Sequence, residues 1–314
     1  SLSGGGTHSG SFNATAPGTL QFSGGTHSST AGAHGGTGTV FFSSGNVTLS
    51  GTATYNAAAT RVTNGTAVLN VNGSTVSLNQ SGGYLGGTGT FTITGSATWS
   101  GGTWGEPSNT GGTTVLDPGV NLLINGASTY SYLGYGRTLN NNGTITYTAP
   151  AYYLNFYVGG TLNNAGTFDM QTDQGILASG TGNLFSNTSV LQKTAGTGVS
   201  TISVPLNNSG SVLASTGTLS LSGGGTHSGS FNATAPGAVQ FNGGNHSSPS
   251  GSYAGTGLFL FSSGNVLLSG TTTYNSAATR VTNGTAVFNV DATTSSLEQT
   301  GGYLGGTGTF TIAG

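Results

Sequence analysis

Short runs that alternate apolar and polar residues recur along the whole chain, separated by clusters of glycine, asparagine and serine. Examples are TLQF at 19–22, TVFF at 39–42, TFTIT at 90–94 and TITYT at 144–148. Alternation of this kind, rich in β-branched and aromatic residues, predicts strands with one buried face. No segment of twelve or more residues has helical periodicity, and glycine recurs too often for a long helix to persist. The pattern therefore predicts an all-β protein.

The alternating segments belong to a long tandem repeat. Residues 1–95 align without a gap to residues 220–314, so that Ser1 corresponds to Ser220, and 72 of the 95 positions are identical. The first eighteen residues, SLSGGGTHSGSFNATAPG, return unchanged at 220–237. We interpret 1–219 as one full long repeat and 220–314 as the beginning of the next. We expect the array to continue beyond both ends.

A shorter period runs inside the long repeat. Segments resembling LNN begin at Leu139, Leu162, Leu184 and Leu206, and so recur about every 22 residues. About ten units of about 22 residues therefore fit one long repeat. A β-propeller needs roughly 40 residues per blade and a closed ring, which a continuing repeat does not favour. The spacing instead predicts a parallel β-helix (a β-solenoid) with one coil per unit.

This fold explains the unusual composition. Only 3% of the residues are charged, and Thr, Ser, Asn and Gly take their place. Equivalent residues of successive coils lie about 4.8 Å apart, so ten coils advance roughly 48 Å and the whole chain would form a rod of roughly 65–70 Å. Like charges at that spacing repel by nearly ~1 kcal/mol even in water. Asn columns can instead hydrogen-bond along the stack, and we expect the LNN segments to form such a ladder at a bend.

The few charges and the lack of cysteine exclude several classes of partner. Four basic and six acidic residues give a net charge of −2, without the Lys/Arg cluster that nucleic acid or an anionic membrane requires. No apolar run approaches the roughly 20 residues of a transmembrane helix. The chain contains no Cys, which excludes disulfides and thiolate metal sites. We therefore predict neither a nucleic-acid partner nor membrane insertion in this segment.

The histidines are the first candidates for chemistry. His8 and His27 both lie in GGTHS, about one coil apart, and their copies are His227 and His246. Neighbouring rings could share a metal ion, but no carboxylate or thiolate is near, and the third candidate ligand, His34, is a Tyr in the other copy. We therefore predict no metal site and no cofactor, and place these histidines in stacked turns on the surface.

The carboxylates give little support to an enzyme. Glycoside hydrolysis needs two carboxyl groups about 5–10 Å apart, and the only close pair in sequence is Asp169 and Asp173, in DMQTD. On one extended strand these two residues would lie about 13 Å apart, although a turn between them could bring them closer. Neither has a basic residue or a histidine nearby in sequence. We predict that the protein is not an enzyme, with a carbohydrate-active β-helix enzyme as the alternative.

Aromatic residues are concentrated in one part of the chain. Seven of the twelve tyrosines fall between Tyr130 and Tyr157, and two tryptophans precede them in WSGGTW. Exposed aromatic side chains could hold sugar rings or contact a neighbouring rod, whereas inward ones would form a core ladder. The candidate contact residues are Trp99, Trp104, Tyr130, Tyr132, Tyr135, Tyr152, Tyr153 and Tyr157. Tyr152 and Tyr153, if both lie in a strand, must point to opposite faces.

The passages TGTLSLSGGGTHSGSF (216–231), ATWSGGTW (97–104), RTLNNNGT (137–144) and VPLNNSGSV (204–212) resemble large prokaryotic surface proteins. The family is that of filamentous-haemagglutinin-like and autotransporter-passenger-like adhesins and filament proteins. The likeness spans the chain and is one of repeat texture. It implies a right-handed parallel β-helix, secretion to the cell surface, and a role in adhesion, biofilm matrix or filaments. The expected partners are copies of the chain itself, with surface glycans as the alternative.

Overall fold

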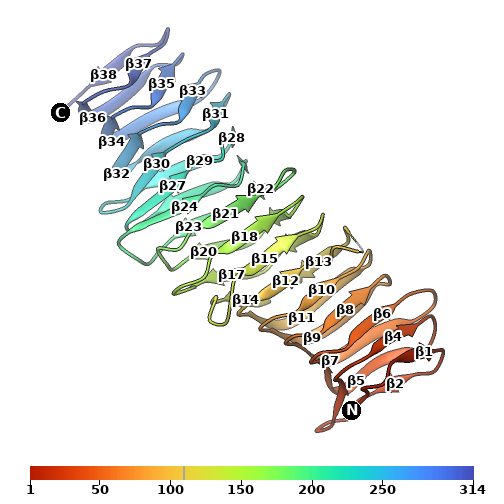
Figure 1. Ribbon diagram of the computed structural model, residues 1–314. Helices are drawn as coiled ribbons and strands as arrows, with labels where there is room; N and C mark the ends of the chain where they lie inside the picture. The colour runs from red at the N-terminus through yellow and green to blue at the C-terminus, as the bar shows by residue number, and fades with distance from the viewer. Residues whose placement is uncertain (109) are drawn as a thin grey trace. The chain divides into compact units, whose positions relative to one another are not determined.

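The structure is a computed structural model that describes residues 1–108 and 110–314. Over these residues it consists of 38 short strands joined by turns, with no helix. The strands pair in parallel with strands one turn later in the chain, which makes the fold an all-β parallel β-solenoid, as predicted (Figure 1). About 15 turns of about 20 residues are present, so the turn is slightly shorter than the coil expected from the LNN segments. The physical reason is that turn length varies: one turn runs from Asn46 to its partner Thr66, and the next, from Thr66 to Tyr84, is shorter.

The chain divides into two compact units. Unit 1 comprises Ser1–Leu162 and Ser179–Asn183, and unit 2 comprises Asn163–Ala178 and Leu184–Gly314. Each turn contributes to three parallel ladders, and long strands such as β5 belong to two ladders because a bulge divides them. Strands β19 (Thr161–Asn164) and β21 (Ile176–Ser179) include residues of both units.

Unit 1 contains three ladders. The first is β1 (Gly6–His8), β4 (Thr26–Ser29), β6 (Asn46–Leu49), β8 (Thr66–Leu69), β10 (Tyr84–Gly86), β12 (Gly102–Trp104), β15 (Ser131–Gly134) and β18 (Leu154–Tyr157). The second is β2 (Phe12–Asn13), the first parts of β5 (Ala33–Phe42), β7 (Thr54–Val62), β9 (Gly73–Gln80) and β11 (Thr90–Trp99), then β13 (Thr113–Leu116) and β16 (Thr138–Asn141). The third is β3 (Thr19–Phe22), the second parts of β5, β7, β9 and β11, then β14 (Asn121–Ile124) and β17 (Thr144–Tyr147).

Unit 2 is built in the same way. One ladder is β20 (Thr167–Met170), β23 (Val190–Lys193), β26 (Ser211–Ala214), β29 (Ser230–Ala233), the first parts of β32 (Ser252–Phe261), β34 (Thr273–Val281) and β36 (Ala292–Gln299), then β38 (Phe310–Ile312). Another is β22 (Leu184–Asn187), β25 (Leu206–Asn208), β28 (Gly225–Thr226), β31 (Asn245–Ser248), β33 (Asn265–Leu268), β35 (Thr285–Phe288) and β37 (Tyr303–Gly305). The third is β24 (Val199–Ile202), β27 (Thr218–Leu221), β30 (Ala238–Phe241) and the second parts of β32, β34 and β36.

Inward-pointing side chains of successive turns fill the core of each unit. Phe22 and Phe42 occupy the same register position on β3 and β5, and their rings stack with centroids 5.6 Å apart and planes 8° apart. The copies of these residues, Phe241 and Phe261, stack at 5.5 Å and 11°. Offset stacking in this range is favourable beyond the burial of the rings. Both copies of the long repeat therefore build the same core contact.

Close approach of successive turns explains some of the glycines. Gly25 has φ +68, and a Cβ atom there would collide with the backbone of Gly5 one turn earlier. Its copy, Gly244, has φ +66 and would collide with the backbone of Gly224. Only glycine combines a positive φ with no side chain in the way, so the GGTHS and GGNHS segments need glycine at these positions.

The asparagine ladder predicted from the LNN segments is present in unit 2. Asn164 donates from Nδ2 to Oδ1 of Asn187 at 2.7 Å, and Asn187 donates to Oδ1 of Asn208 at 2.7 Å. All three side chains are almost completely buried. The register differs from the prediction by one residue, because Leu206 pairs with Phe185 and not with Leu184. The strand register therefore aligns Asn187 with Asn208, as their side-chain hydrogen bond requires, and does not align the two leucines.

We expect Asn187→Ala to lower the free energy of unfolding by about 2–3 kcal/mol. The substitution removes the donor to Asn208 and Ser211 and leaves the Asn164 amide without its Asn187 acceptor. Equilibrium urea unfolding measures the change. Ser186→Ala is the matched control, because Ser186 lies on the same strand and points outward; it should change stability by less than about 0.5 kcal/mol. Equal effects of the two substitutions would contradict a stabilising ladder.

Candidate functional site

The histidines of the GGTHS segments lie in the core, so the prediction that they are surface turn residues is wrong. His27 and its copy His246 are each 2% exposed, and His227 is fully buried, whereas His8 is half-buried. The glycines end the turn, and the histidine is already the second residue of strand β4, whose alternating burial turns His27 and Ser29 inward. The histidine therefore belongs to the strand and not to the turn.

Within each pair the two histidines lie within hydrogen-bonding distance of each other. His8 Nε2 lies 3.1 Å from His27 Nδ1, and His27 Nε2 lies 3.0 Å from the carbonyl oxygen of Gly24. The copies, His227 and His246, form the same pair at 3.0 Å. Because the carbonyl of Gly24 can only accept, Nε2 of His27 donates to it, and Nδ1 of His27 then accepts from His8. In the described part of the chain, no group of three or more His, Cys, Asp or Glu side chains is arranged to hold a metal ion.

His34 and its copy, Tyr253, each contact the hydroxyl of a buried serine, His34 through a ring nitrogen and Tyr253 through its own hydroxyl. His34 Nε2 lies 2.9 Å from Oγ of Ser29, and in the second copy the hydroxyl of Tyr253 lies 2.6 Å from Oγ of Ser248. Both side chains are buried. Burial lowers the pKa of His34, and its buried Nδ1 has no hydrogen-bond partner among the residues that the structure describes. Tyrosine fills the same place without an unpaired ring nitrogen.

We expect His34→Tyr to stabilise the protein by about 1 kcal/mol at pH 7, because it removes a buried unpaired acceptor. The gain should be larger at pH 5. The pKa of His34 is below its unfolded value, so the unfolded chain takes up a proton first as the pH falls, and the native protein is destabilised. Urea unfolding at both pH values measures the difference. A loss of stability at both would show that unit 1 does not accept the arrangement of the second copy.

The two candidate catalytic carboxylates are held by different partners. Asp173 Oδ1 lies 3.0 Å from Nζ of Lys193, and this hydrogen bond holds the pKa of Asp173 below its usual value. Asp169 accepts from Oγ1 of Thr194 at 2.7 Å and from Nε2 of Gln171 at 2.8 Å. Each carboxylate therefore has a structural partner that explains its position.

Trp99 and Trp104 do not form part of a surface contact, which corrects the prediction. Both are fully buried, and their rings stack with centroids 4.2 Å apart and planes 2° apart. Nε1 of Trp104 donates to the buried Oε1 of Gln80 at 2.9 Å. The alternation of β11 turns Trp99 inward, and β12 places Trp104 beside it after the intervening bend. The tryptophans are the core ladder that inward aromatics were expected to form.

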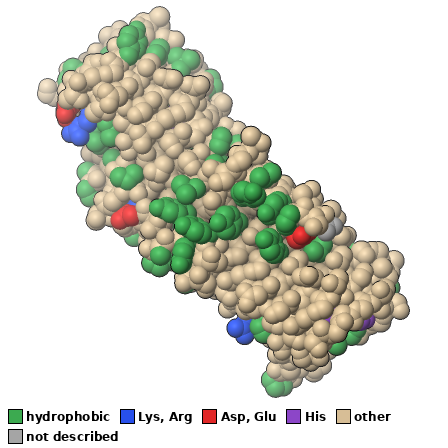
Figure 2. All heavy atoms as spheres, in the orientation of Figure 1, with side chains coloured by type: hydrophobic (Ala, Val, Ile, Leu, Met, Phe, Trp, Pro, Cys, Tyr) green, Lys and Arg blue, Asp and Glu red, His purple; other side chains and the backbone are tan. Residues whose placement is uncertain are grey.

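The six candidate tyrosines, in contrast, reach the surface. Tyr130 and Tyr157 are exposed, and the other four are half-buried: Tyr132, Tyr135, Tyr152 and Tyr153. Tyr130 contacts Tyr152 and Tyr153, with ring centroids at 5.2 and 6.2 Å. Tyr152 and Tyr153 precede strand β18, so the opposite-face rule for strands does not apply to them. Figure 2 shows apolar and tyrosine side chains gathered over this part of the face, on a surface otherwise mostly of other side chains and backbone.

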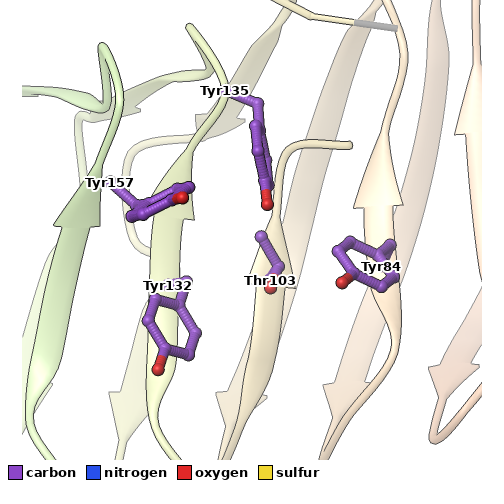
Figure 3. Close-up of a pocket in the computed structure, with 5 residues that line it drawn as sticks. All are labelled: Tyr84, Thr103, Tyr132, Tyr135 and Tyr157. Atoms are coloured by element: carbon purple, nitrogen blue, oxygen red, sulfur yellow. The ribbon is translucent and has the colours of Figure 1, made fainter. Parts of the chain in front are cut away.

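A groove of about 260 Å³ opens among these tyrosines in unit 1. We call it the tyrosine groove; its lining residues are Tyr84, Thr103, Tyr132, Tyr135 and Tyr157 (Figure 3). Tyr84, Thr103 and Tyr132 occupy one register position on the neighbouring strands β10, β12 and β15. Tyr135 lies directly after β15 and Tyr157 is the last residue of β18, with ring centroids 5.3 Å apart and planes at 73°.

Sequence reasoning missed Tyr84 and Thr103. Tyr84 lies well before Tyr130 in the chain, outside the tyrosine-rich segment. The turn length could have indicated the pairing of Tyr84 with Thr103, because the two residues are one turn of ordinary length apart in the sequence. The next turn, from Thr103 to Tyr132, is much longer, and this irregular length conceals the register in the sequence.

The charges around the tyrosine groove are few. Burial and the neighbouring Tyr130 raise the pKa of Tyr132, and burial, nearby tyrosines and Glu106 raise that of Tyr135, so both hydroxyls stay protonated at neutral pH. Arg137, two positions after Tyr135, is fully buried. Its guanidinium donates to the carbonyl oxygens of Gly87 and Thr113 and to Oγ1 of Thr114, and burial lowers its pKa to about 10.

Comparison with protein-family models, with curated proteins and with solved structures finds no match for the chain. The part of the chain that the structure describes contains no helix long and apolar enough to span a membrane.

Proposed function

We propose that the chain is a segment of an extracellular structural β-solenoid, in which right-handed coils of 219-residue tandem repeats form a rod or filament. The observation that supports this proposal is that the second copy repeats the internal contacts of the first. The hydroxyl of Tyr55 lies 2.7 Å from Oγ1 of Thr60, and that of Tyr274 lies 2.7 Å from Oγ1 of Thr279. The distances within the histidine pairs and within the phenylalanine stacks also agree closely between the two copies. A sequence that rebuilds the same coils with each copy is suited to growth by addition of copies.

The chemistry of the surface also supports a structural role. The proposed rod carries few charges, and the two acids that an enzyme could have used are engaged by Lys193 and Thr194. Backbone hydrogen bonds between turns would carry force along the rod, and neutral Thr, Ser and Asn side chains would contact neighbouring rods. In this proposal the partners are copies of the chain itself, and neither nucleic acid nor a substrate is required.

Imaging of chains with one, two and three tandem copies tests the proposal. Turns of about 20 residues at about 4.8 Å per turn should lengthen the particle by roughly 50 Å per copy, at constant width. Negative-stain electron microscopy measures the length, and small-angle X-ray scattering measures the cross-section. Particles that grow in all dimensions, or that remain globular, would contradict the proposal.

Ligand binding is a second function that we propose for the same solenoid, because unit 1 carries the tyrosine groove. A surface glycan is the ligand expected from the sequence, and a flat, open tyrosine face would favour it. In the groove, however, the rings of Tyr135 and Tyr157 meet at 73°, and those of Tyr132 and Tyr157 at 82°. Tyrosine rings at such large angles to one another can surround a compact group, but they do not form the flat surface on which a sugar ring stacks.

A further inference from the structure

The tyrosine groove has two opposing walls and a low floor. Parallel neighbouring strands lie about 4.8 Å apart, so Tyr84 and Tyr132, which flank Thr103, are separated at the backbone by about 9.6 Å. The small side chain of Thr103 leaves the space between the two rings open. Figure 3 shows Tyr135 reaching toward Thr103 between them, and Tyr157 beside Tyr132. Aromatic rings thus face the space above Thr103 from several directions.

The backbone is strained where it positions the remaining walls. Tyr135 has φ +54, and Val158, next to Tyr157, has φ +43; these are the only two described residues other than glycine with a positive φ. A bulky or β-branched residue in this conformation costs roughly 1–2 kcal/mol, and such strain concentrates at ligand sites. Both strained positions border the same groove. The backbone N–H of Tyr135 donates to the carbonyl of Tyr157, and that of Val158 to the carbonyl of Ser179, so hydrogen bonds between turns hold both strained positions in place.

The charge distribution favours a cation. The faces of tyrosine rings carry negative potential. Glu106, just beyond strand β12, lies against Gly86, two residues after Tyr84, and its carboxylate contributes to raising the pKa of Tyr135. Oε2 of Glu106 also accepts from the backbone N–H of Ser108 at 3.0 Å. None of the described residues that line the groove is Lys or Arg. Arg137 follows Tyr135 closely in the chain, but its guanidinium is buried and donates to three oxygen atoms there. A volume of about 260 Å³ suits a compact group.

We propose that the tyrosine groove binds the trimethylammonium head of a choline-type ligand, with Tyr84, Tyr132 and Tyr135 as its aromatic walls and Glu106 as its acidic rim. Aromatic side chains arranged around a quaternary ammonium attract it through cation–π interactions. Thr103 limits the depth of the groove and leaves the remainder of the ligand in solvent. This site is independent of whether the chain forms filaments.

The decisive experiment compares choline with its neutral isostere, 3,3-dimethyl-1-butanol, which has the same shape without the charge. Isothermal titration calorimetry or NMR titration of the full chain should show choline binding at least tenfold more tightly, since several cation–π contacts act together. A methyl glucoside is the third ligand, and phosphatidylcholine vesicles the fourth. Equal binding of choline and its isostere, preference for the glucoside, or no binding of choline would each overturn the proposal. Vesicle binding in addition to choline binding would identify a membrane lipid as the source of the head group.

Variants locate the site. Tyr84→Leu and Tyr132→Leu should each weaken choline binding at least tenfold, and Glu106→Gln about threefold to tenfold. Tyr303, the copy of Tyr84 in unit 2, is the matched control: it is 57% exposed, and Tyr303→Leu should leave binding unchanged. Circular dichroism confirms that each variant is folded. Binding that survives both leucine substitutions in folded variants would show that the groove is not the site.

Discussion

Replacing Lys193 by methionine is expected to lower the free energy of unfolding by about 3–5 kcal/mol, although the substitution preserves the length of the side chain. Lys193 is fully buried, and the three N–H groups of its ammonium are shared among four oxygen atoms at 2.9–3.0 Å: Asp173 Oδ1, the carbonyl oxygens of Thr172 and Ala195, and Oγ of Ser200. Methionine removes this donor from all four; Gly198 N–H still donates to Asp173 and Ser200 Oγ still donates to the Thr172 carbonyl. Equilibrium urea unfolding of the full chain measures the loss.

Two control variants separate the buried hydrogen bonds from charge pairing as such. Asp173→Asn should cost less than Lys193→Met, about 1–2 kcal/mol, because the 47% exposed side chain is solvated and its amide oxygen still accepts from Nζ, which also keeps its other acceptors. Arg280→Met breaks the exposed pair with Glu298, at 2.7 Å, and should cost less than about 1 kcal/mol. If Lys193→Met is as mild as Arg280→Met, the buried cation does not stabilise unit 2.

The fold could be predicted from the sequence because strands, turns and the long repeat leave periodic signals. The LNN segments even indicated the hydrogen-bonded asparagines, since Asn164, Asn187 and Asn208 recur at nearly constant spacing. Handedness leaves no such signal. The alternation of apolar and polar residues is the same for either hand.

The interior polar residues could not be predicted in the same way. His27, Lys193 and Arg137 are polar or charged residue types that usually lie on the surface, yet each is buried against backbone carbonyl oxygens. Those carbonyl groups belong to turns that are distant in sequence or to the preceding loop. Residue type alone therefore gave the wrong location for the histidines.

The tyrosine groove was predicted in part. The tyrosine-rich segment contains Tyr132, Tyr135 and Tyr157. The remaining lining tyrosine, Tyr84, comes from two turns before Tyr132, and the second of these turns, from Thr103 to Tyr132, is unusually long. The tryptophans, judged by the same criterion of aromatic density, belong to the core. Whether an aromatic residue points in or out depends on its register in the ladder, which an irregular turn length conceals.

Acidification from pH 7 to pH 5 is expected to destabilise the protein by about 4 kcal/mol through His227 and His246 alone. Burial, with a smaller repulsion from His246, lowers the pKa of His227 to about 3, and burial lowers that of His246 to about 4. Both values lie below the unfolded value of 6.5. Stability from this pair is therefore complete above pH 6.5 and is lost as the pH falls toward the native pKa values, because the unfolded chain binds up to two more protons than the native one. Between pH 6 and pH 5 the slope rises to about 2.5 kcal/mol per pH unit.

The double variant His227→Phe/His246→Phe tests this origin of the acid sensitivity. Phenylalanine fills the space of the rings but does not titrate, so most of the slope between pH 7 and pH 5 should disappear. The variant also loses the donor to the carbonyl of Gly243, 3.0 Å from Nε2 of His246, and should be less stable than the native protein by roughly 1–3 kcal/mol at pH 7. The slope is the informative quantity, because the loss of that hydrogen bond is independent of pH. The carboxylate of Asp173, whose pKa is lowered, contributes only below about pH 4 and so lies outside this window. A slope that persists in the double variant would assign the acid sensitivity to groups other than the buried histidine pair.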